Sequence, residues 1–104
     1  MSAVWKYEFD ATQVRIDEPY YFDLEVPRNA KLLHLDVQLQ SRMDGNLPNM
    51  EVPSVWAWVD PDAEKEPRRF MLVGTGHAIP HQALAYVGTF KMDQDRLVLH
   101  LFEI

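Results

Sequence analysis

The strongest constraint on the fold is an alternation of apolar and polar residues with a period of two. It is clearest at residues 33–39, where Leu33, Leu35, Val37 and Leu39 alternate with His34, Asp36 and Gln38. Successive side chains of a strand point to opposite faces, so we expect the first four in the core and the other three in solvent. Residues 5–9 and 20–26 show the same pattern, and no segment has the period of an amphipathic helix.

Turn signals divide the chain into short segments. Pro27-Arg28-Asn29-Ala30 predicts a turn in which Asn29 tolerates a positive φ, and Asp93-Gln94-Asp95 predicts a tight hairpin loop. Strands are expected at residues 5–9, 20–26, 33–39, 55–59, 68–73, 85–92 and 96–102, with a weaker candidate at 12–16. Residues 41–53 are expected to form the longest loop and residues 60–67 a charged connector, with one short helical turn at 79–83.

This pattern predicts an all-β fold in a single domain, residues 1–104. About seven or eight short strands are typical of a small antiparallel β-sandwich or a partly open barrel. A chain of 104 residues can bury one ordinary core without disulfides or structural metals.

Composition excludes several kinds of chemistry. The chain has no Cys, which rules out disulfides, thiolate zinc sites and cysteine nucleophiles. A net charge of −6 with 10 basic residues is a poor match for direct binding to nucleic-acid phosphates. It suits docking onto a basic protein surface, or simply a well-solvated surface. The lack of Cys fits a reducing cytosol. No long apolar run or signal-peptide pattern occurs, so we expect no membrane contact.

Three strands are apolar on both faces. Residues 55–59, 70–73 and 97–102 carry more apolar surface than one partner sheet can cover. Self-association would cover the remaining face, so the sequence predicts a homo-oligomer, most simply a two-fold dimer. Loops of the same chain are the alternative cover.

The turn Gly74-Thr75-Gly76-His77 is the leading candidate for a binding site. Two glycines one residue apart permit a sharp turn and a close approach of a ligand to the backbone, where N–H groups can hold an anion. It matches neither a P-loop nor a dinucleotide-binding fingerprint. The alternative is a glycine-rich corner between strands.

Two pairs of side chains extend this candidate site. Arg68 and Arg69 fall on opposite faces of a strand, so one of them could reach the glycine turn and bind a phosphate or carboxylate. The alternative for them is an ion pair with Asp62, Glu64 or Glu66. Trp56 and Trp58 share one face, where they could stack a base or sugar, or else fill the core or an oligomer interface.

Catalysis and metal binding find little support. His77 and His81 are four residues apart, but Pro80 lies between them and breaks a regular helix, so no metal site is expected. The carboxylates fall in no recognisable catalytic arrangement, and neither Ser41 nor Ser54 has flanking glycines. We therefore expect a protein that is not an enzyme and carries no cofactor.

Several blocks of the sequence together resemble a family of small uncharacterised proteins carried by bacteriophages and prophages. The blocks are Val4-Trp5-Lys6-Tyr7, Pro27-Arg28-Asn29-Ala30, Val55-Trp56-Ala57, Arg68-Arg69-Phe70, Gly74-Thr75-Gly76-His77-Ala78-Ile79-Pro80, Tyr86-Val87-Gly88-Thr89-Phe90 and Leu99-His100-Leu101-Phe102-Glu103. Residues 41–53 are longer than the family pattern. The resemblance implies a phage origin and the cytoplasm of an infected bacterium, and it implies no activity.

Three hypotheses about function follow. The first is a phage accessory protein that binds and neutralises a host factor, such as a host defence protein, in the manner of an anti-CRISPR inhibitor. The second is a protein that binds or sequesters a small anionic ligand, such as a nucleotide signal, at the turn of residues 74–77. The third is a structural or assembly component. Acidity and the lack of catalytic residues favour the first.

Overall fold

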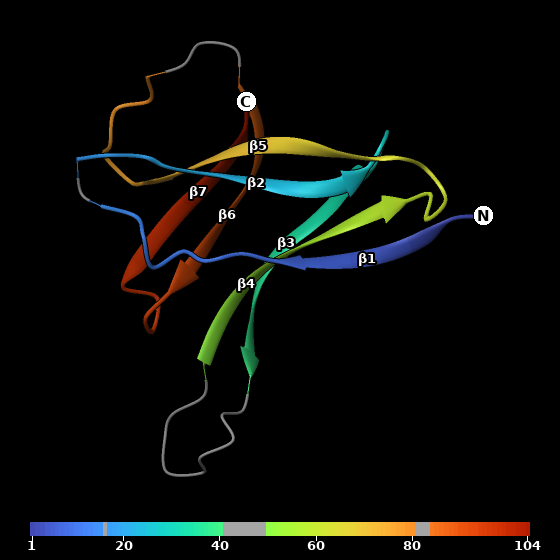
Figure 1. Ribbon diagram of the computed structural model, residues 1–104. Coiled ribbons are helices and arrows are strands. Elements are labelled where there is room, and N and C mark those ends of the chain that lie inside the picture. Colours follow the sequence, from blue (N-terminus) through green and yellow to red (C-terminus); the bar gives the residue numbers. More distant parts are fainter. Residues whose placement is uncertain (16, 41–49, 81–83) are drawn as a thin grey trace.

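The protein is an open β-sandwich of seven antiparallel strands, as the alternation predicts (Figure 1). The computed structural model describes residues 1–15, 17–40, 50–80 and 84–104. The strands are β1 (Ala3–Glu8), β2 (Tyr20–Pro27), β3 (Lys31–Gln40), β4 (Met50–Val59), β5 (Lys65–Gly74), β6 (Ala85–Met92) and β7 (Leu97–Glu103). They form one sheet in the order β1-β4-β3 and another in the order β2-β5-β7-β6. Neither sheet closes into a barrel.

The described part of the chain contains no helix. Accordingly, none of its elements is a helix of the length and apolarity needed to cross a bilayer. The weak strand candidate at residues 12–16 contributes only an isolated bridge between Arg15 and Glu18. Most of the expected loop, at residues 41–49, and most of the expected helical turn, at residues 81–83, lie outside the described residues. Ile79 and Pro80, at the start of that turn, have no regular secondary structure.

The core lies between the inner faces of the two sheets. Its larger part contains Phe9, Val55, Phe70, Leu72, Phe90, Leu99 and Leu101, and its smaller part contains Val26, Ala30, Ala57 and Val59. The ring of Phe22 stacks on both Phe9 and Phe70, with centroids 4.9 and 5.5 Å away. The inward face that alternation predicts for β2 is confirmed, since Tyr20, Phe22, Leu24 and Val26 all pack in or against this core.

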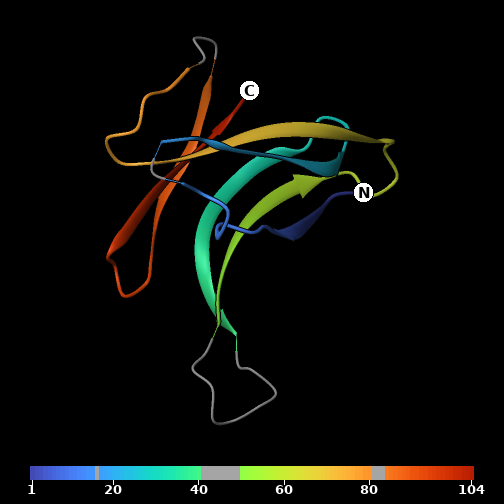
Figure 2. The same cartoon turned by 60° about the vertical axis from the view of Figure 1, so that its left-hand side comes forward.

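The predicted core face of β3 is partly wrong. Leu35 and Val37 pack inward, but Leu33 and Leu39 are 46% and 66% exposed, and Leu32 takes the inward position instead. The pairing with β4 shifts between Leu32 and His34, so Leu33 is the extra residue of a bulge. Before the bulge the even-numbered Leu32 faces the core, and after it the odd-numbered Leu35 and Val37 do. Leu39 lies near the far end of the long β3–β4 pair, which extends away from the other strands (Figure 2).

β4 and β5 begin at Met50 and Lys65, well before the predicted residues 55 and 68, and the added segment of each contains a proline. Pro53 lies in β4, one residue beyond the last position that pairs with β1. Pro67 lies in the part of β5 that pairs only with β2, since pairing with β7 begins at Phe70. A proline lacks the N–H of a ladder bond. The ladder with β1 accordingly ends at Pro53, whose carbonyl still accepts the N–H of Phe9 at 3.1 Å, and Pro67 lies where β5 has no partner strand on its other side. The charged connector therefore spans only residues 60–64.

The turns follow the local sequence closely. Ala30 donates its N–H to the carbonyl of Pro27 at 3.1 Å, and Asn29 has the expected positive φ of 66°. The β6–β7 hairpin places Asp93, Gln94 and Asp95 in the left-handed region, with φ values of 54°, 56° and 65°. Each such non-glycine residue costs about 1–2 kcal/mol relative to right-handed backbone.

The chain itself covers one of the three two-faced strands. Phe70, Met71, Leu72 and Val73 of β5 are all buried, although alternate residues face opposite sides of the sheet. On the outer side Met71 lies in register between Tyr21 of β2 and Phe102 of β7, whose large side chains flank it. Trp58 of β4, by contrast, is 52% exposed. The homo-oligomer stays a prediction, and the apolar surface that motivates it is smaller than the sequence indicates.

Candidate functional site

The glycine turn at the end of β5 is held by its own histidine. His77 donates its N–H to the carbonyl of Gly74 at 3.2 Å, and Gly74 donates its N–H to Nδ1 of the His77 ring at 3.1 Å. A Cβ atom on Gly74 would lie 2.9 Å from Cε1 of that ring, and Gly76 has a φ of 88°. Both glycines are therefore required, Gly74 for space and Gly76 for its backbone conformation.

This arrangement determines which nitrogen of His77 carries the proton. Nδ1 accepts the bond from Gly74, so it has no proton, and the proton of the neutral ring is on Nε2. A doubly protonated ring could not accept that bond. His77 therefore offers one N–H donor from Nε2 while its other nitrogen stabilises the turn.

Thr75 connects the turn to the outer face of β6 and β7. Its Oγ1 lies 2.8 Å from Nε2 of His100, whose Nδ1 lies 2.9 Å from Oγ1 of Thr89. Thr89 is hydrogen bonded in turn to the hydroxyl of Tyr86. Sequence reasoning placed His100 on a strand face but did not detect this chain of bonds. Register across β6 and β7 was the missing information, because Thr89 lies directly opposite His100.

The turn lines a pocket of about 370 Å³, which we call the arginine pocket. Its walls come from the turn, the segment after β1 and the start of β7: Val14, Arg15, Gly74, Thr75, His77, Arg96, Leu97, Val98 and Leu99. The two arginines are exposed, and neither makes an ion pair with any described residue. The pocket thus combines an apolar lining with two uncompensated positive charges.

Arg68 and Arg69 lie elsewhere. They point to opposite faces of β5, as alternation predicts, but about six residues along a strand separate Arg68 from Gly74, or roughly 20 Å. Arg68 makes a bidentate ion pair with Glu103, with both N–O distances 2.6 Å, and donates to the carbonyl of Ala30. Arg69 pairs with Asp23 at 3.4 Å and lies over the ring of Tyr21. Both therefore have structural partners, though different ones from those the sequence suggests.

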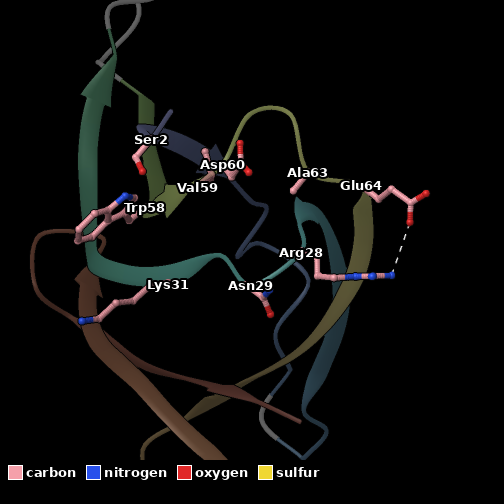
Figure 3. A pocket seen from close by; sticks show the side chains of 9 residues that line it. All are labelled: Ser2, Arg28, Asn29, Lys31, Trp58, Val59, Asp60, Ala63 and Glu64. Atoms are coloured by element: carbon pink, nitrogen blue, oxygen red, sulfur yellow. Dashed lines mark ion pairs between the residues drawn. The ribbon is translucent and has the colours of Figure 1, made fainter.

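The two tryptophans are on the other sheet. Trp56 and Trp58 share the outer face of β4, whereas Trp5 packs inward against the smaller part of the core. The ring of Trp56 lies 5.8 Å from that of His34. Trp58 borders a separate pocket of about 590 Å³, shared with Arg28, Lys31, Asp60 and Glu64 (Figure 3). Arg28 and Glu64 pair with each other at one side of this pocket, with an N–O distance of 3.6 Å (Figure 3).

The structure thus assembles only part of the predicted site. Gly74, Thr75, Gly76 and His77 stay together around one pocket, with Arg15 and Arg96 in place of the predicted arginine pair. Neither of these two arginines has a local sequence signal, since each comes from an irregular segment or a turn. In the described ranges, no group of three or more His, Asp or Glu is arranged to hold a metal ion, and His81 lies outside them.

Comparison with known proteins gives a family and no close relative. The chain has no match among curated proteins and none among solved structures. A model of a domain of unknown function matches residues 1–104, which is the whole chain. This agrees with the expected membership of an uncharacterised family. The protein belongs to the family described as a domain of unknown function, DUF7352.

Proposed function

We propose that the protein is a non-catalytic binding protein whose arginine pocket takes a small anionic ligand, such as a phosphate ester or a nucleotide. One observation carries this proposal. Arg15 and Arg96 line a largely apolar pocket and form no ion pair with a described carboxylate, in a chain whose net charge is −6. Elsewhere in this acidic protein Arg28, Arg68 and Arg69 each have a carboxylate partner.

The pocket offers a suitable donor set for such a ligand. Guanidinium groups bind phosphate and carboxylate oxygens through paired N–H donors. The Nε2–H of His77 lies in the same lining and adds a neutral donor. Val14, Leu97 and Val98 provide apolar surface for the uncharged part of the ligand. Affinity would come from the charged contacts together with burial of that apolar part.

A thermal-shift experiment with pyrophosphate and with AMP tests this proposal. Ligand that binds only the folded state raises its stability, by about 2.7 kcal/mol at a hundred times the Kd. We expect a rise in Tm for the wild-type protein and its loss in the double variant Arg15→Gln/Arg96→Gln. Arg69→Gln is the matched control and should keep the full shift, because Arg69 lies on the outer face with Asp23. An equal shift in the double variant would exclude both arginines from the site.

A second candidate is a protein that binds and neutralises a host factor. The exposed Trp58 and its neighbour in register, Val4, favour it, because an indole and an apolar side chain on an outer sheet face are typical anchors of protein interfaces. The resemblance to phage proteins would place this activity in an infected bacterium, with a defence protein as the target. Capture of the same host protein by the wild type and by Trp58→Ser would argue against this face as the contact.

A further inference from the structure

A second concave surface, independent of the arginine pocket, lies where the β3–β4 pair leaves the rest of the sandwich. It has a volume of about 490 Å³ and is bordered by residues 8–12 after β1, residues 50–53 of β4 and Met92 at the end of β6. We call it the acidic groove. Phe9, Ala11 and Val52 are buried beneath it, and Met50 stands at its border with 45% of its surface exposed.

Among the described residues, the charges that line the acidic groove all have one sign. They belong to Glu8, Asp10 and Glu51, and no described Lys, Arg or His lines it. Glu51 is fixed in place, because its Oε1 accepts the backbone N–H of Asp93 at 2.8 Å. Asp10 accepts bonds from the hydroxyl and the backbone N–H of Thr12, and these bonds lower the pKa of Asp10. Lys6 offsets the charge of Glu8 only weakly, at 3.7 Å on the surface.

The apolar part of the groove suits insertion of a side chain. Met50 and Met92 are unbranched and polarisable, so they can adapt to the shape of an inserted group. An apolar centre with a charged border is the usual anatomy of a protein–protein contact, in which the border selects a partner of opposite charge. Together these features define the chemistry of the occupant.

We propose that the acidic groove docks a basic segment of another protein. One apolar side chain of that segment inserts near Met50 and Met92, and its Lys or Arg side chains lie against Glu8, Asp10 and Glu51. A second copy of this chain is the weaker occupant, because two molecules of net charge −6 repel each other. A basic partner is instead attracted by the same charge. This inference does not depend on a ligand in the arginine pocket.

Titration of the full-length, isotope-labelled protein by NMR tests the proposal. The probe is the capped peptide Lys-Lys-Leu-Lys-Lys, and its matched control has Ser in place of Leu. We expect saturable shifts of the backbone amides of residues 8–12, 50–52 and 92–93 with the first peptide. The Ser peptide should bind about tenfold more weakly, as expected for loss of a partly buried leucine side chain. Equal binding of both peptides would overturn the proposal, as would the absence of shifts or shifts centred elsewhere.

Variants separate the groove from the general charge of the protein. In Asp10→Asn/Glu51→Gln each side chain keeps its hydrogen-bond acceptor and loses its charge, and we expect it to bind the Leu peptide several-fold more weakly. Asp17→Asn/Asp62→Asn removes the same charge at exposed positions outside the groove and should bind nearly as well as wild type. Equal loss in both variants would show that only net charge matters. Shifts of the groove amides on diluting the protein alone would identify a second copy as the occupant and overturn the proposal.

Discussion

Gly88 lies where β6 and β3, edge strands of the two sheets, contact each other. A Cβ atom there would lie 2.9 Å from Cδ2 and 3.3 Å from Cβ of Leu35, so the approach of β6 to β3 requires the absence of a side chain. Both strands have a register shift at this corner, between Tyr86 and Gly88 in β6 and between Leu32 and His34 in β3. Bulges bend strands, and these two bring the sheet edges together.

We expect Gly88→Ala to lower the free energy of unfolding by about 1–3 kcal/mol, the usual cost of overpacking a core. Urea denaturation measures this change. In the Leu35→Ala background the same substitution should cost less, because the side chain that it meets has been shortened. Additive losses in the two backgrounds would show that the close contact is not the cause.

At the scale of strands, the ion pair of Arg68 and Glu103 stabilises the packing of the two sheets. Arg68 of β5 bonds Glu103 at the end of β7 and also the carbonyl of Ala30, next to the start of β3 in the other sheet. The two charged side chains are only 20% and 22% exposed. Their hydrogen bond raises the pKa of Arg68, whereas burial opposes it. One guanidinium thus joins three segments that are far apart in the sequence.

Removing the charge of Arg68 or of Glu103 should leave the other side chain charged, partly buried and without its ion-pair partner. We expect Arg68→Met and Glu103→Gln each to cost about 1–3 kcal/mol, between the values for exposed and fully buried pairs. The double variant should lose clearly less than the sum of the two. Chemical denaturation of all four proteins gives the coupling energy. A coupling near zero would mean that Arg68 acts through its bond to Ala30 alone.

The strands themselves were predictable from the sequence, but their ends and one of their faces were not. The sequence pattern identifies all seven strands, β1 to β3 by alternation and the others by strand-forming runs between turn signals. It misplaced the starts of β4 and β5, where Pro53 and Pro67 resemble loop residues until the pairing on each side of the strand is known. It also placed Leu33 on the core face, whereas a bulge turns this residue to solvent. A bulge depends on how two strands pair, so the sequence of one strand alone does not reveal it.

The candidate site shows the same division between local and distant information. The turn of residues 74–77 was predictable, since two glycines and a histidine that bonds back to Gly74 are all local. The arginines were not. Arg68 is paired with Glu103, which is 35 residues away in the sequence. Arg15 and Arg96 are distant from the turn in the sequence and line the same pocket only because the fold brings them together. Sequence patterns therefore locate the backbone of the site and leave its charged side chains undetermined.

For the whole molecule, charge is distributed unevenly over an acidic surface. In the part of the chain that the structure describes, the charged residues that line the acidic groove are carboxylates, and those that line the arginine pocket are the unpaired Arg15 and Arg96. The outer face of the three-stranded sheet is different again. There Lys31 and Val4 lie opposite Trp58, and Lys6 and His34 lie opposite Trp56. Glu8 and Asp36 lie on the same face, 3.7 Å from Lys6 and 3.6 Å from His34. This face therefore combines exposed apolar surface with charges of both signs, so two copies of an acidic chain repel each other less there than at the acidic groove.

The predicted dimer should therefore form through the tryptophan face. Met71 and Val73 are already buried within one chain, which leaves the four-stranded sheet with less apolar surface to cover, whereas Trp58 and Val4 are 52% and 60% exposed. We expect sedimentation equilibrium to give twice the 12.2 kDa mass of the chain, with tighter association as salt screens the net repulsion.

Two variants locate the interface. Trp58→Ser should be monomeric at the same concentration. Tyr86→Ser, on the outer face of the other sheet, should remain a dimer. The opposite result for these two variants would place the interface on the four-stranded sheet. A wild-type monomer at every protein and salt concentration would contradict the predicted dimer.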